Sequence, residues 1–192
     1  MVPVLLGLGS NAGFKGAAPL QLLGEACRRM CLMMPDIVVS SVYLTRAMYV
    51  TEQDDFYNMA AYGSVSDSCT PDELLRYIHM VEAALGRDRT KEIRNGPRSI
   101  DIDIELFGAI KCSSAELTVP HPRISERAFV LIPALEILPK SADCEYREVF
   151  AEYARRLPDQ GVRFLLSACD FRKRYLQEAV NGTERDSGNC SG

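Results

Sequence analysis

The amino-acid sequence predicts an α+β fold with a ferredoxin-like βαββαβ core, a mainly antiparallel sheet and additional helices toward the C-terminus. Two patterns carry this prediction. Segments with an apolar residue at every third or fourth position, the period of a helix, occur between short β-rich or strictly alternating runs, the pattern of strands. We expect residues 1–180 to form a single domain. Residues 181–192 contain no apolar residue except Cys190 and are predicted to be a disordered tail.

The first half of the core contains one predicted helix and three predicted strands. Val2–Leu8 is a short apolar run that suits a central strand, and Pro19–Met34 has the apolar spacing of an amphipathic helix. Ile37–Thr45 is rich in β-branched residues and is predicted to be one long strand, with Phe56–Val65 as its neighbour. The glycines of Gly9–Gly13 match neither a Walker loop nor a dinucleotide fingerprint, so a tight turn is the favoured interpretation.

The second helix has a clear start signal. Thr70 suits the N-cap, Pro71 the first helical position and Glu73 the reciprocal position of a capping box, and Gly86 ends the helix. Beyond the core, Ala128–Leu138, Tyr146–Leu157 and Phe171–Val180 are predicted to be helices, Leu117–Arg123 an extended segment, and Val162–Cys169 either a strand or a helix.

The predicted strand Ile100–Leu106, which follows the second helix, carries the most distinctive charge pattern. From Ile100 to Leu106 apolar and acidic residues alternate, which predicts Ile100, Ile102, Ile104 and Leu106 on one face and Asp101, Asp103 and Glu105 on the other. Same-face neighbours lie about 6.6 Å apart, so Asp101 and Asp103 can point at one cation or at two adjacent ones. The ordinary alternative is a solvated acidic face.

A basic loop precedes this strand. It contains Arg87, Arg89, Lys91, Arg94 and Arg98 around the turn at Gly96-Pro97. Hard oxygen ligands bind Mg²⁺, and one guanidinium group can donate two parallel hydrogen bonds to phosphate oxygens. A basic loop next to paired carboxylates therefore suits a metal-bound polyphosphate.

Composition limits the other classes of function. The net charge is −4 and the pI is about 5.3, so we expect no general nucleic-acid binding. No apolar run approaches the roughly 20 residues of a membrane span, and the first residues lack the basic start of a signal peptide. The seven cysteines are odd in number and scattered, which favours free thiols, including the close pair Cys27 and Cys31, and predicts a cytoplasmic location.

Two histidines and one aromatic pair complete the candidates. His79 lies in the second predicted helix, where packing or exposure on the surface is favoured over catalysis. His121 lies between two prolines, with Arg127 close behind it, and anion contact is as good an interpretation as packing. The aromatic pair Phe56 and Tyr57, followed by Asn58, suits core packing, but an aromatic ring with a neighbouring amide also suits a flat heterocycle.

Taken together and in order, these segments closely resemble 6-hydroxymethyl-7,8-dihydropterin pyrophosphokinase, a family of folate biosynthesis. The resemblance covers roughly residues 1–140, and its most specific part is Gly-Pro-Arg-x-x-Asp-x-Asp followed by the Pro-His segment. The segments that carry it are Gly7–Asn11, Phe56–Asn58, Gly86–Arg87, Gly96–Asp103 and Val119–Arg123, with Arg127 and Phe129.

The resemblance implies transfer of a pyrophosphoryl group from ATP to the hydroxymethyl oxygen of the pterin, with release of AMP. It implies that Asp101 and Asp103 hold two Mg²⁺ ions and that Arg87 and Arg98 act on the phosphates during transfer. The nucleotide contacts that it implies are Arg89, His79, Glu82, Ile104, Thr118, His121 and Arg127. The pterin contacts that it implies are Thr45, Phe56, Asn58 and Phe129.

Several points stay open at this level. A different Mg²⁺-dependent phosphotransferase or nucleotidyl hydrolase could use the same residues, and a non-catalytic nucleotide-binding module is a further alternative. The loop Arg46–Val50 differs from the proline- and glycine-containing loop usual in relatives, so its pterin contacts are left open. We expect the loop between Gly86 and Gly96 to close over ATP. The expected partners are the two small-molecule substrates, without nucleic acid or membrane, for a monomer or a weak dimer.

Overall fold

The computed structural model describes residues 1–47, 53–89, 96–140 and 145–177, and the statements below concern these ranges. The predicted tail 181–192, the cysteines Cys144 and Cys190, and the middle of the basic loop, with Lys91 and Arg94, lie outside the described residues. So does most of the segment Arg46–Val50. Within the described ranges, the cysteines are free thiols and no helix is long and apolar enough to cross a membrane.

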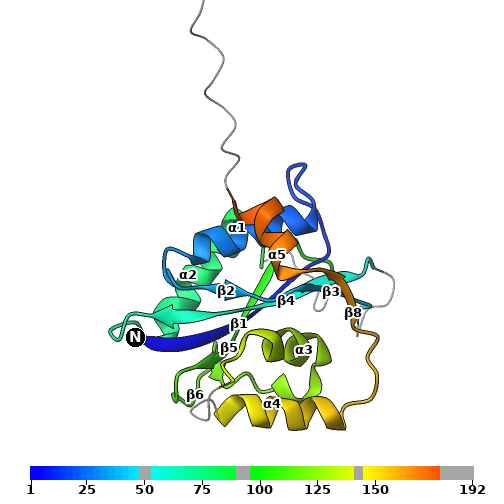
Figure 1. Ribbon diagram of the computed structural model, residues 1–192. Coiled ribbons are helices and arrows are strands. Elements are labelled where there is room, and N and C mark those ends of the chain that lie inside the picture. Colours follow the sequence, from blue (N-terminus) through cyan, green and yellow to red (C-terminus); the bar gives the residue numbers. More distant parts are fainter. Residues whose placement is uncertain (48–52, 90–95, 141–144, 178–192) are drawn as a thin grey trace, which may run out of the picture.

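One antiparallel sheet forms the centre of the molecule, with helices on both of its faces (Figure 1). The strand order is β5-β1-β4-β3-β8, and β2 pairs with β4. The strands are β1 (Val2–Ser10), β2 (Val38–Val39), β3 (Val42–Thr45), β4 (Phe56–Val65), β5 (Asp101–Phe107) and β8 (Arg163–Leu166). The expected combination of helices with a mainly antiparallel sheet is therefore confirmed.

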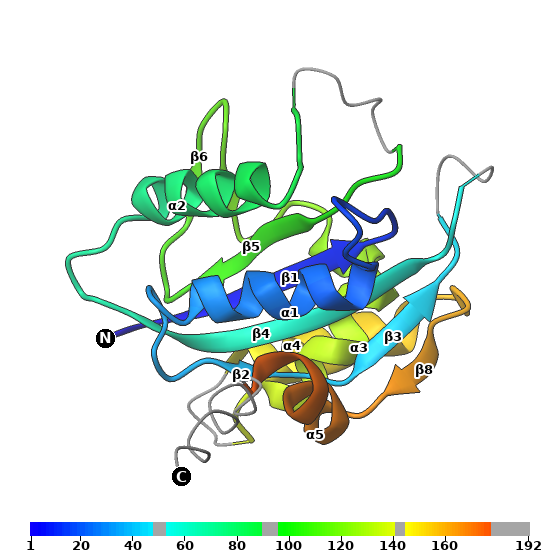
Figure 2. The same cartoon turned by 90° about the horizontal axis from the view of Figure 1, so that it is seen from above.

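Helices α1 (Pro19–Met30) and α2 (Pro71–Ala84) cover one face of the sheet (Figure 2). The predicted capping box of α2 is present, because the backbone N–H of Glu73 donates to Thr70 Oγ1 at 3.2 Å and the N–H of Thr70 donates to Glu73 Oε2 at 2.8 Å. Apolar residues of α1, α2 and the sheet pack into the larger core cluster.

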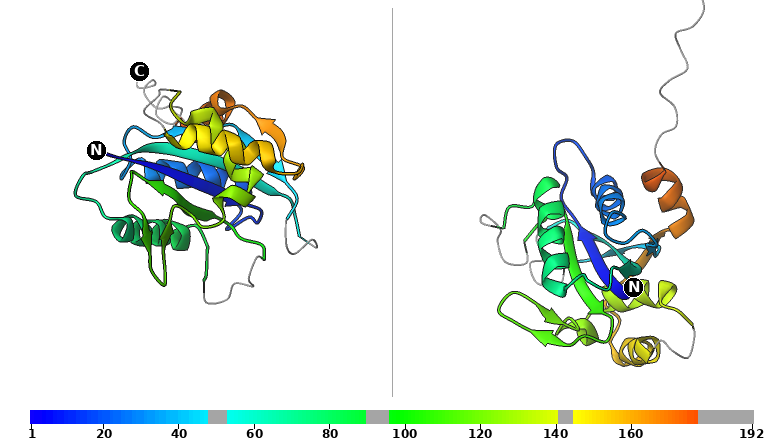
Figure 3. Two further views of the ribbon diagram at one scale, coloured as in Figure 1. Left: turned by 90° about the horizontal axis from the view of Figure 1, so that it is seen from below. Right: turned by 90° about the vertical axis from the view of Figure 1, so that its left-hand side faces the viewer.

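The opposite face is covered by α3 (Ala128–Ile137), with α4 (Glu145–Arg156) packed outside it (Figure 3). A short hairpin of β6 (Cys112–Ser113) and β7 (Thr118–Val119), followed by the 3₁₀ helix η1 (Ile124–Glu126), leads from β5 to α3. The undecided segment Val162–Cys169 contributes strand β8, which pairs with β3. The chain then continues through α5 (Ala168–Phe171) and the short π-helix η2 (Arg172–Leu176), which packs against α1.

Two local predictions are wrong. The strand predicted over Ile37–Thr45 is interrupted between β2 and β3, because the N–H of Ser41 donates to Glu136 Oε2 of α3 at 2.7 Å instead of joining the strand ladder. The tight turn predicted to begin at Gly9 does not begin there, because β1 continues through Gly9 to Ser10 and pairs with β4 along its whole length.

The alternation in β5 also ends earlier than predicted. Leu5 pairs with Leu106 and Leu6 with Ile104, so Glu105 is an extra residue in a bulge. The extra residue places the side chains that follow it on the opposite face of the sheet from the one that the alternation predicts. Leu106 therefore packs in the cluster under α3 rather than beside Ile102 and Ile104.

Candidate active site

A pocket lies on the α3 side of the sheet, above two glycines of β1. A Cβ atom on Gly7 would lie 2.9 Å from Glu105 Oε1, and one on Gly9 would lie 3.1 Å from Asn58 Oδ1. Since larger residues would crowd these side chains, the glycines leave the pocket floor open. Neither glycine was singled out in the sequence for this role; their spacing of two in a strand, which puts both on one face, is the signal that could have indicated it.

The two aspartates of β5 line this pocket together. Asp101 pairs with Gly9 and Asp103 with Gly7 in the sheet, so both carboxylates face the same side as the glycine floor. The side chains are 24% and 38% exposed respectively, and both have cationic partners. A freely solvated acidic face therefore does not describe this strand.

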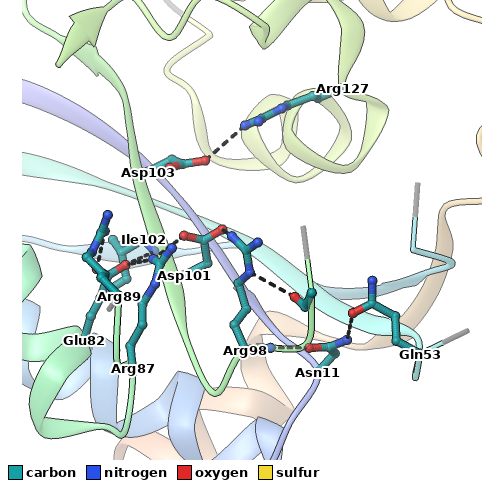
Figure 4. A network of polar contacts seen from close by, with 11 residues as sticks. Asn11, Gln53, Glu82, Arg87, Arg89, Arg98, Asp101, Ile102, Asp103 and Arg127 are labelled. Atoms are coloured by element: carbon teal, nitrogen blue, oxygen red, sulfur yellow. Dashed lines mark hydrogen bonds and ion pairs between the residues drawn. The ribbon is translucent and has the colours of Figure 1, made fainter. Parts of the chain in front are cut away.

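Each aspartate contacts an arginine from another part of the chain (Figure 4). Arg98 donates from Nη1 to Asp101 Oδ2 at 2.6 Å, and Arg87 also donates to Asp101. Arg127, at the start of α3, donates from Nη1 to Asp103 Oδ2 at 3.0 Å. The site thus combines paired carboxylates with several guanidinium groups, a set that suits both a divalent cation and phosphate oxygens.

The two carboxyl groups differ in pKa. Burial acts to raise the pKa of Asp101, but the charges of Arg87 and Arg98 outweigh it and lower that pKa below its ordinary value. Burial and the neighbouring charge of Asp101 raise the pKa of Asp103 to about 6, against the opposing effect of Arg127. A divalent cation would relieve this repulsion, so the residues present fit a metal ion in this respect.

The part of the chain that the structure describes has no larger metal-binding cluster. It contains no cluster of three or more histidine, cysteine, aspartate or glutamate side chains suited to hold a metal ion. Mg²⁺ is commonly bound by one or two carboxylates together with substrate phosphates rather than by a complete protein cage. The pair therefore suits a metal that arrives with a polyphosphate.

A buried ion-pair chain connects α2 to β5. Glu82, only 1% exposed, accepts from the N–H of Ile102 at 2.8 Å and from Nη2 of Arg89 at 2.6 Å. Arg87, 6% exposed, donates to both Glu82 and Asp101. Arg87 thereby holds Asp101 in place from the end of α2. His79 lies beside this chain in a second hollow, and burial lowers its pKa.

Asn11 is a site residue that the sequence interpretation missed. Its Oδ1 accepts from the N–H of Arg98 at 2.8 Å, and its Nδ2 donates to Gln53 Oε1 at 3.0 Å. It therefore joins the segment before β5 to the segment before β4, on two sides of the pocket. Asn11 follows directly on the glycine strand, and an amide at a strand end was the signal available.

Aromatic and amide side chains also line this pocket. Phe56 and Phe129 both line it, and Asn58 Nδ2 donates to Thr45 Oγ1 at 2.7 Å. The guanidinium carbon of Arg127 lies 5.7 Å from the centre of the Phe129 ring. The structure therefore brings the four predicted pterin contacts to the same pocket as the two aspartates.

Of the seven predicted nucleotide contacts, Arg127 lines this pocket, and Arg89, His79 and Glu82 line the second hollow. The other three line neither. Ile104 packs in the core, and Thr118 lies in the β6–β7 hairpin, with its Oγ1 3.4 Å from Ser113 Oγ. His121 lies beside β5, where its N–H donates to the carbonyl of Glu105 at 3.0 Å. Its Nδ1 accepts from the N–H of Arg123 at 3.1 Å, and burial together with Arg127 lowers its pKa to about 4. His121 is therefore neutral near pH 7.

Glu105 is the unusual group beside this site. Its side chain is fully buried, and neither carboxyl oxygen has a hydrogen-bond partner among the described residues. Nδ1 of His121 is 4.0 Å from Oε2, beyond hydrogen-bond distance, and it already accepts from the N–H of Arg123. Burial, followed by the charge of Asp103, raises the pKa of Glu105 well above its ordinary value.

We expect Glu105→Gln to stabilise the protein more at pH 8 than at pH 5. The folded chain keeps the Glu105 proton that the unfolded chain releases, so stability is complete below the unfolded pKa and is lost as pH rises toward the folded pKa. Glutamine has nearly the same shape and does not titrate. Thermal unfolding at both pH values, without Mg²⁺, measures the difference. An equal gain at both pH values would contradict the expectation, and the exposed Glu116→Gln is the control.

A family model described as 7,8-dihydro-6-hydroxymethylpterin-pyrophosphokinase matches residues 5–139. A curated relative from Methylorubrum extorquens, named 2-amino-4-hydroxy-6-hydroxymethyldihydropteridine pyrophosphokinase, is 40% identical over 141 residues, which are 72% of this chain and 84% of that protein. A folic acid synthesis protein from Pneumocystis carinii is 37% identical over 135 residues. The match covers 70% of this chain and 17% of that longer protein, so the chain spans less than a fifth of this relative.

A solved structure has a similar fold. The crystal structure of wild-type HPPK-DHPS from Plasmodium falciparum matches with a TM-score of 0.57 and 13% sequence identity, over 81% of this chain and 45% of that one. At this identity the likeness concerns the fold, and it agrees with a mixed α/β architecture around an antiparallel sheet.

Proposed function

The chain belongs to the 7,8-dihydro-6-hydroxymethylpterin-pyrophosphokinase family, and we propose that it transfers the pyrophosphoryl group of ATP to the hydroxymethyl group of 6-hydroxymethyl-7,8-dihydropterin in folate biosynthesis. AMP is the second product. The observation that supports this best is one pocket in which paired aspartates, three arginines, two phenylalanines and two side-chain amides meet. These are the groups needed to bring a polyphosphate and a flat heterocycle together.

We propose that Asp101 and Asp103 hold two Mg²⁺ ions. When bound, such ions neutralise phosphate charge and favour deprotonation of the acceptor hydroxyl. The raised pKa of Asp103 supports the assignment, because two partly buried carboxylates side by side call for a compensating cation.

The arginines of the site act on the nucleotide in this proposal. Arg98 and Arg127 contact carboxylates that line the pocket, and each guanidinium has five N–H donors, so each can bind phosphate oxygens while it keeps an aspartate contact. Arg87 and Glu82 hold Asp101 and the start of β5, and Arg89 and His79 border the adjoining hollow. Ile104, Thr118 and His121 complete the proposed nucleotide contacts; neutral His121 would act as a donor through Nε2.

The pterin lies between Phe56 and Phe129 in this proposal, with its polar edge toward Asn58 and Thr45. The hydroxymethyl group would then point toward Asp101 and Asp103 and attack the β-phosphorus in line as the bond to the α,β-bridging oxygen breaks. Little covalent assistance from the protein is needed, because phosphoryl transfer depends mainly on positioning and electrostatics.

The finer description of the fold belongs to the same proposal. A ferredoxin-like core is supported by the order β5-β1-β4-β3, with α1 and α2 on one face. We also propose a single domain over residues 1–180, a cytoplasmic location, and a monomer or a weak dimer.

An assay of AMP formation tests the proposed function. Purified protein with ATP and Mg²⁺ is expected to release AMP and the pterin diphosphate only when 6-hydroxymethyl-7,8-dihydropterin is added. Release of AMP with another acceptor but not with the pterin alcohol would favour a different phosphotransferase. ATP binding without AMP release under any of these conditions would favour a binding module, and either result would overturn the proposal.

A further inference from the structure

Gln160 lies in the connector between α4 and β8, beyond residue 139, where the family match ends. Its side-chain amide contacts the backbone on both sides of Arg127. Gln160 Oε1 accepts from the N–H of Ala128 at 2.9 Å, and Gln160 Nε2 donates to the carbonyl of Glu126 at 2.8 Å. We call these two hydrogen bonds the Gln160 bridge.

The bridge supplies what the start of α3 lacks. The first N–H groups of a helix have no partner inside it, and an N-cap side chain with an acceptor oxygen commonly satisfies one of them. The N-cap of α3 is Arg127, whose side chain has no acceptor and makes no capping hydrogen bond. The amide oxygen of Gln160 takes that place, so the Arg127 side chain remains directed at Asp103.

The corner that the bridge holds is functionally important. Glu126 ends η1 and Ala128 begins α3, and the chain turns between them at Arg127. Arg127 contacts Asp103 at 3.0 Å and lies over the ring of Phe129, so its backbone position sets one wall of the pocket. A shift of the corner would move both the guanidinium and the ring.

The connector is itself anchored on both sides. Before it, α4 packs on α3; after it, β8 pairs with β3, the strand that carries Thr45 (Figure 1). Arg163 of β8 also contacts Asp55, the residue before Phe56, at 3.0 Å. The connector thus links the α3 wall of the pocket to the wall formed by β3 and β4.

We propose that Gln160 is a positioning residue that fixes Arg127 and Phe129 for the reaction. This inference rests on the proposed function, but the bridge itself can be tested without it. The mechanism is geometric: the amide holds the corner, the corner holds the guanidinium, and the guanidinium holds its place beside Asp103.

Gln160→Ala tests this inference, with Gln21→Ala as a matched control. Gln21 Oε1 accepts from the N–H of Ala18 at 2.8 Å, so it also binds a backbone N–H at a helix start, but at α1 and away from the pocket. Misplacement of reacting groups by about 1 Å can cost roughly 100-fold in rate, so we expect Gln160→Ala to lower kcat/KM for the pterin about tenfold. Gln21→Ala is expected to change it less than about twofold.

A double-mutant cycle separates positioning from general destabilisation. In an Arg127→Ala background, Gln160→Ala should add clearly less than the tenfold loss that it causes alone, because the part of its effect that acts through Arg127 is already gone. Gln160→Glu keeps the acceptor for Ala128 but loses the donor to Glu126, so an intermediate loss is expected; this variant also serves if the alanine variant folds poorly. Full activity of Gln160→Ala, or an equal loss in the Arg127→Ala background, would overturn the inference.

A second readout does not depend on activity. The side-chain Nε–H signal of Arg127 in an NMR spectrum, assigned by its absence in Arg127→Lys, should shift or broaden in Gln160→Ala and stay unchanged in Gln21→Ala. An unchanged signal in Gln160→Ala would overturn the bridge. If the wild-type protein released no AMP, the proposed function would fail while this signal still decided the role of Gln160.

Discussion

Asp103→Ala is expected to lower kcat for AMP formation by about 1,000-fold or more, since a carboxylate that positions a catalytic metal contributes several kcal/mol to the transition state. The carboxylate lines the pocket beside Asp101, 3.0 Å from Arg127. Its loss would leave Asp101 as the only carboxylate of the pair. Steady-state AMP release at saturating ATP, Mg²⁺ and pterin measures the effect.

The same variant should not unfold the protein. Because the pKa of Asp103 is raised to about 6, the stability linked to its proton is present below the unfolded value and is already lost above pH 6. Removing the group at pH 8 therefore removes an unfavourable charge. We expect an unchanged or slightly higher Tm together with the loss of activity.

Asp36→Ala is the control for this prediction. Asp36 Oδ1 accepts from the N–H of Ser64 at 2.7 Å, near the end of β4 remote from Phe56, and Asp36 does not line the pocket. This variant should keep wild-type turnover. Comparable turnover by Asp103→Ala, or a loss of activity that follows a loss of circular dichroism, would contradict the role given to Asp103.

The features that sequence reasoning predicted correctly depend on neighbours in the chain. The capping box of α2 needs only Thr70, Pro71 and Glu73, and the alternation of β5 puts Asp101 and Asp103 on one face through the geometry of the strand alone. Local rules of this kind are contained in a few consecutive residues. They gave the main strands and helices of the core.

The features that were missed depend on distant partners. The bulge at Glu105 is set by the pairing of β5 with β1, and the interruption at Ser41 is set by Glu136 of α3. The bridge from Gln160 to the start of α3 spans 32 residues. No periodic pattern in the sequence indicates such contacts, because they exist only when the fold brings the elements together.

The second large effect concerns the buried ion pairs behind the site. Arg87→Met is expected to lower the free energy of unfolding by roughly 3 kcal/mol, because it leaves the buried Glu82 carboxylate with the half-exposed Arg89 and the N–H of Ile102 as its remaining partners. Glu82 is 1% exposed, so bulk water cannot replace the missing guanidinium. For a domain of this size the change corresponds to a fall in Tm of roughly 6–12 °C.

Arg89→Met is the matched control, since Arg89 contacts the same carboxylate at 2.6 Å but is 48% exposed. Exposed ion pairs contribute about 0–1 kcal/mol, so its Tm should change little. If the poorly compensated charge of Glu82 causes the loss, then Glu82→Gln combined with Arg87→Met should be more stable than Arg87→Met alone, because the amide oxygen still accepts from the N–H of Ile102 without a net charge. A double variant as unstable as Arg87→Met would instead assign the effect to lost packing and to the remaining partner, Asp101.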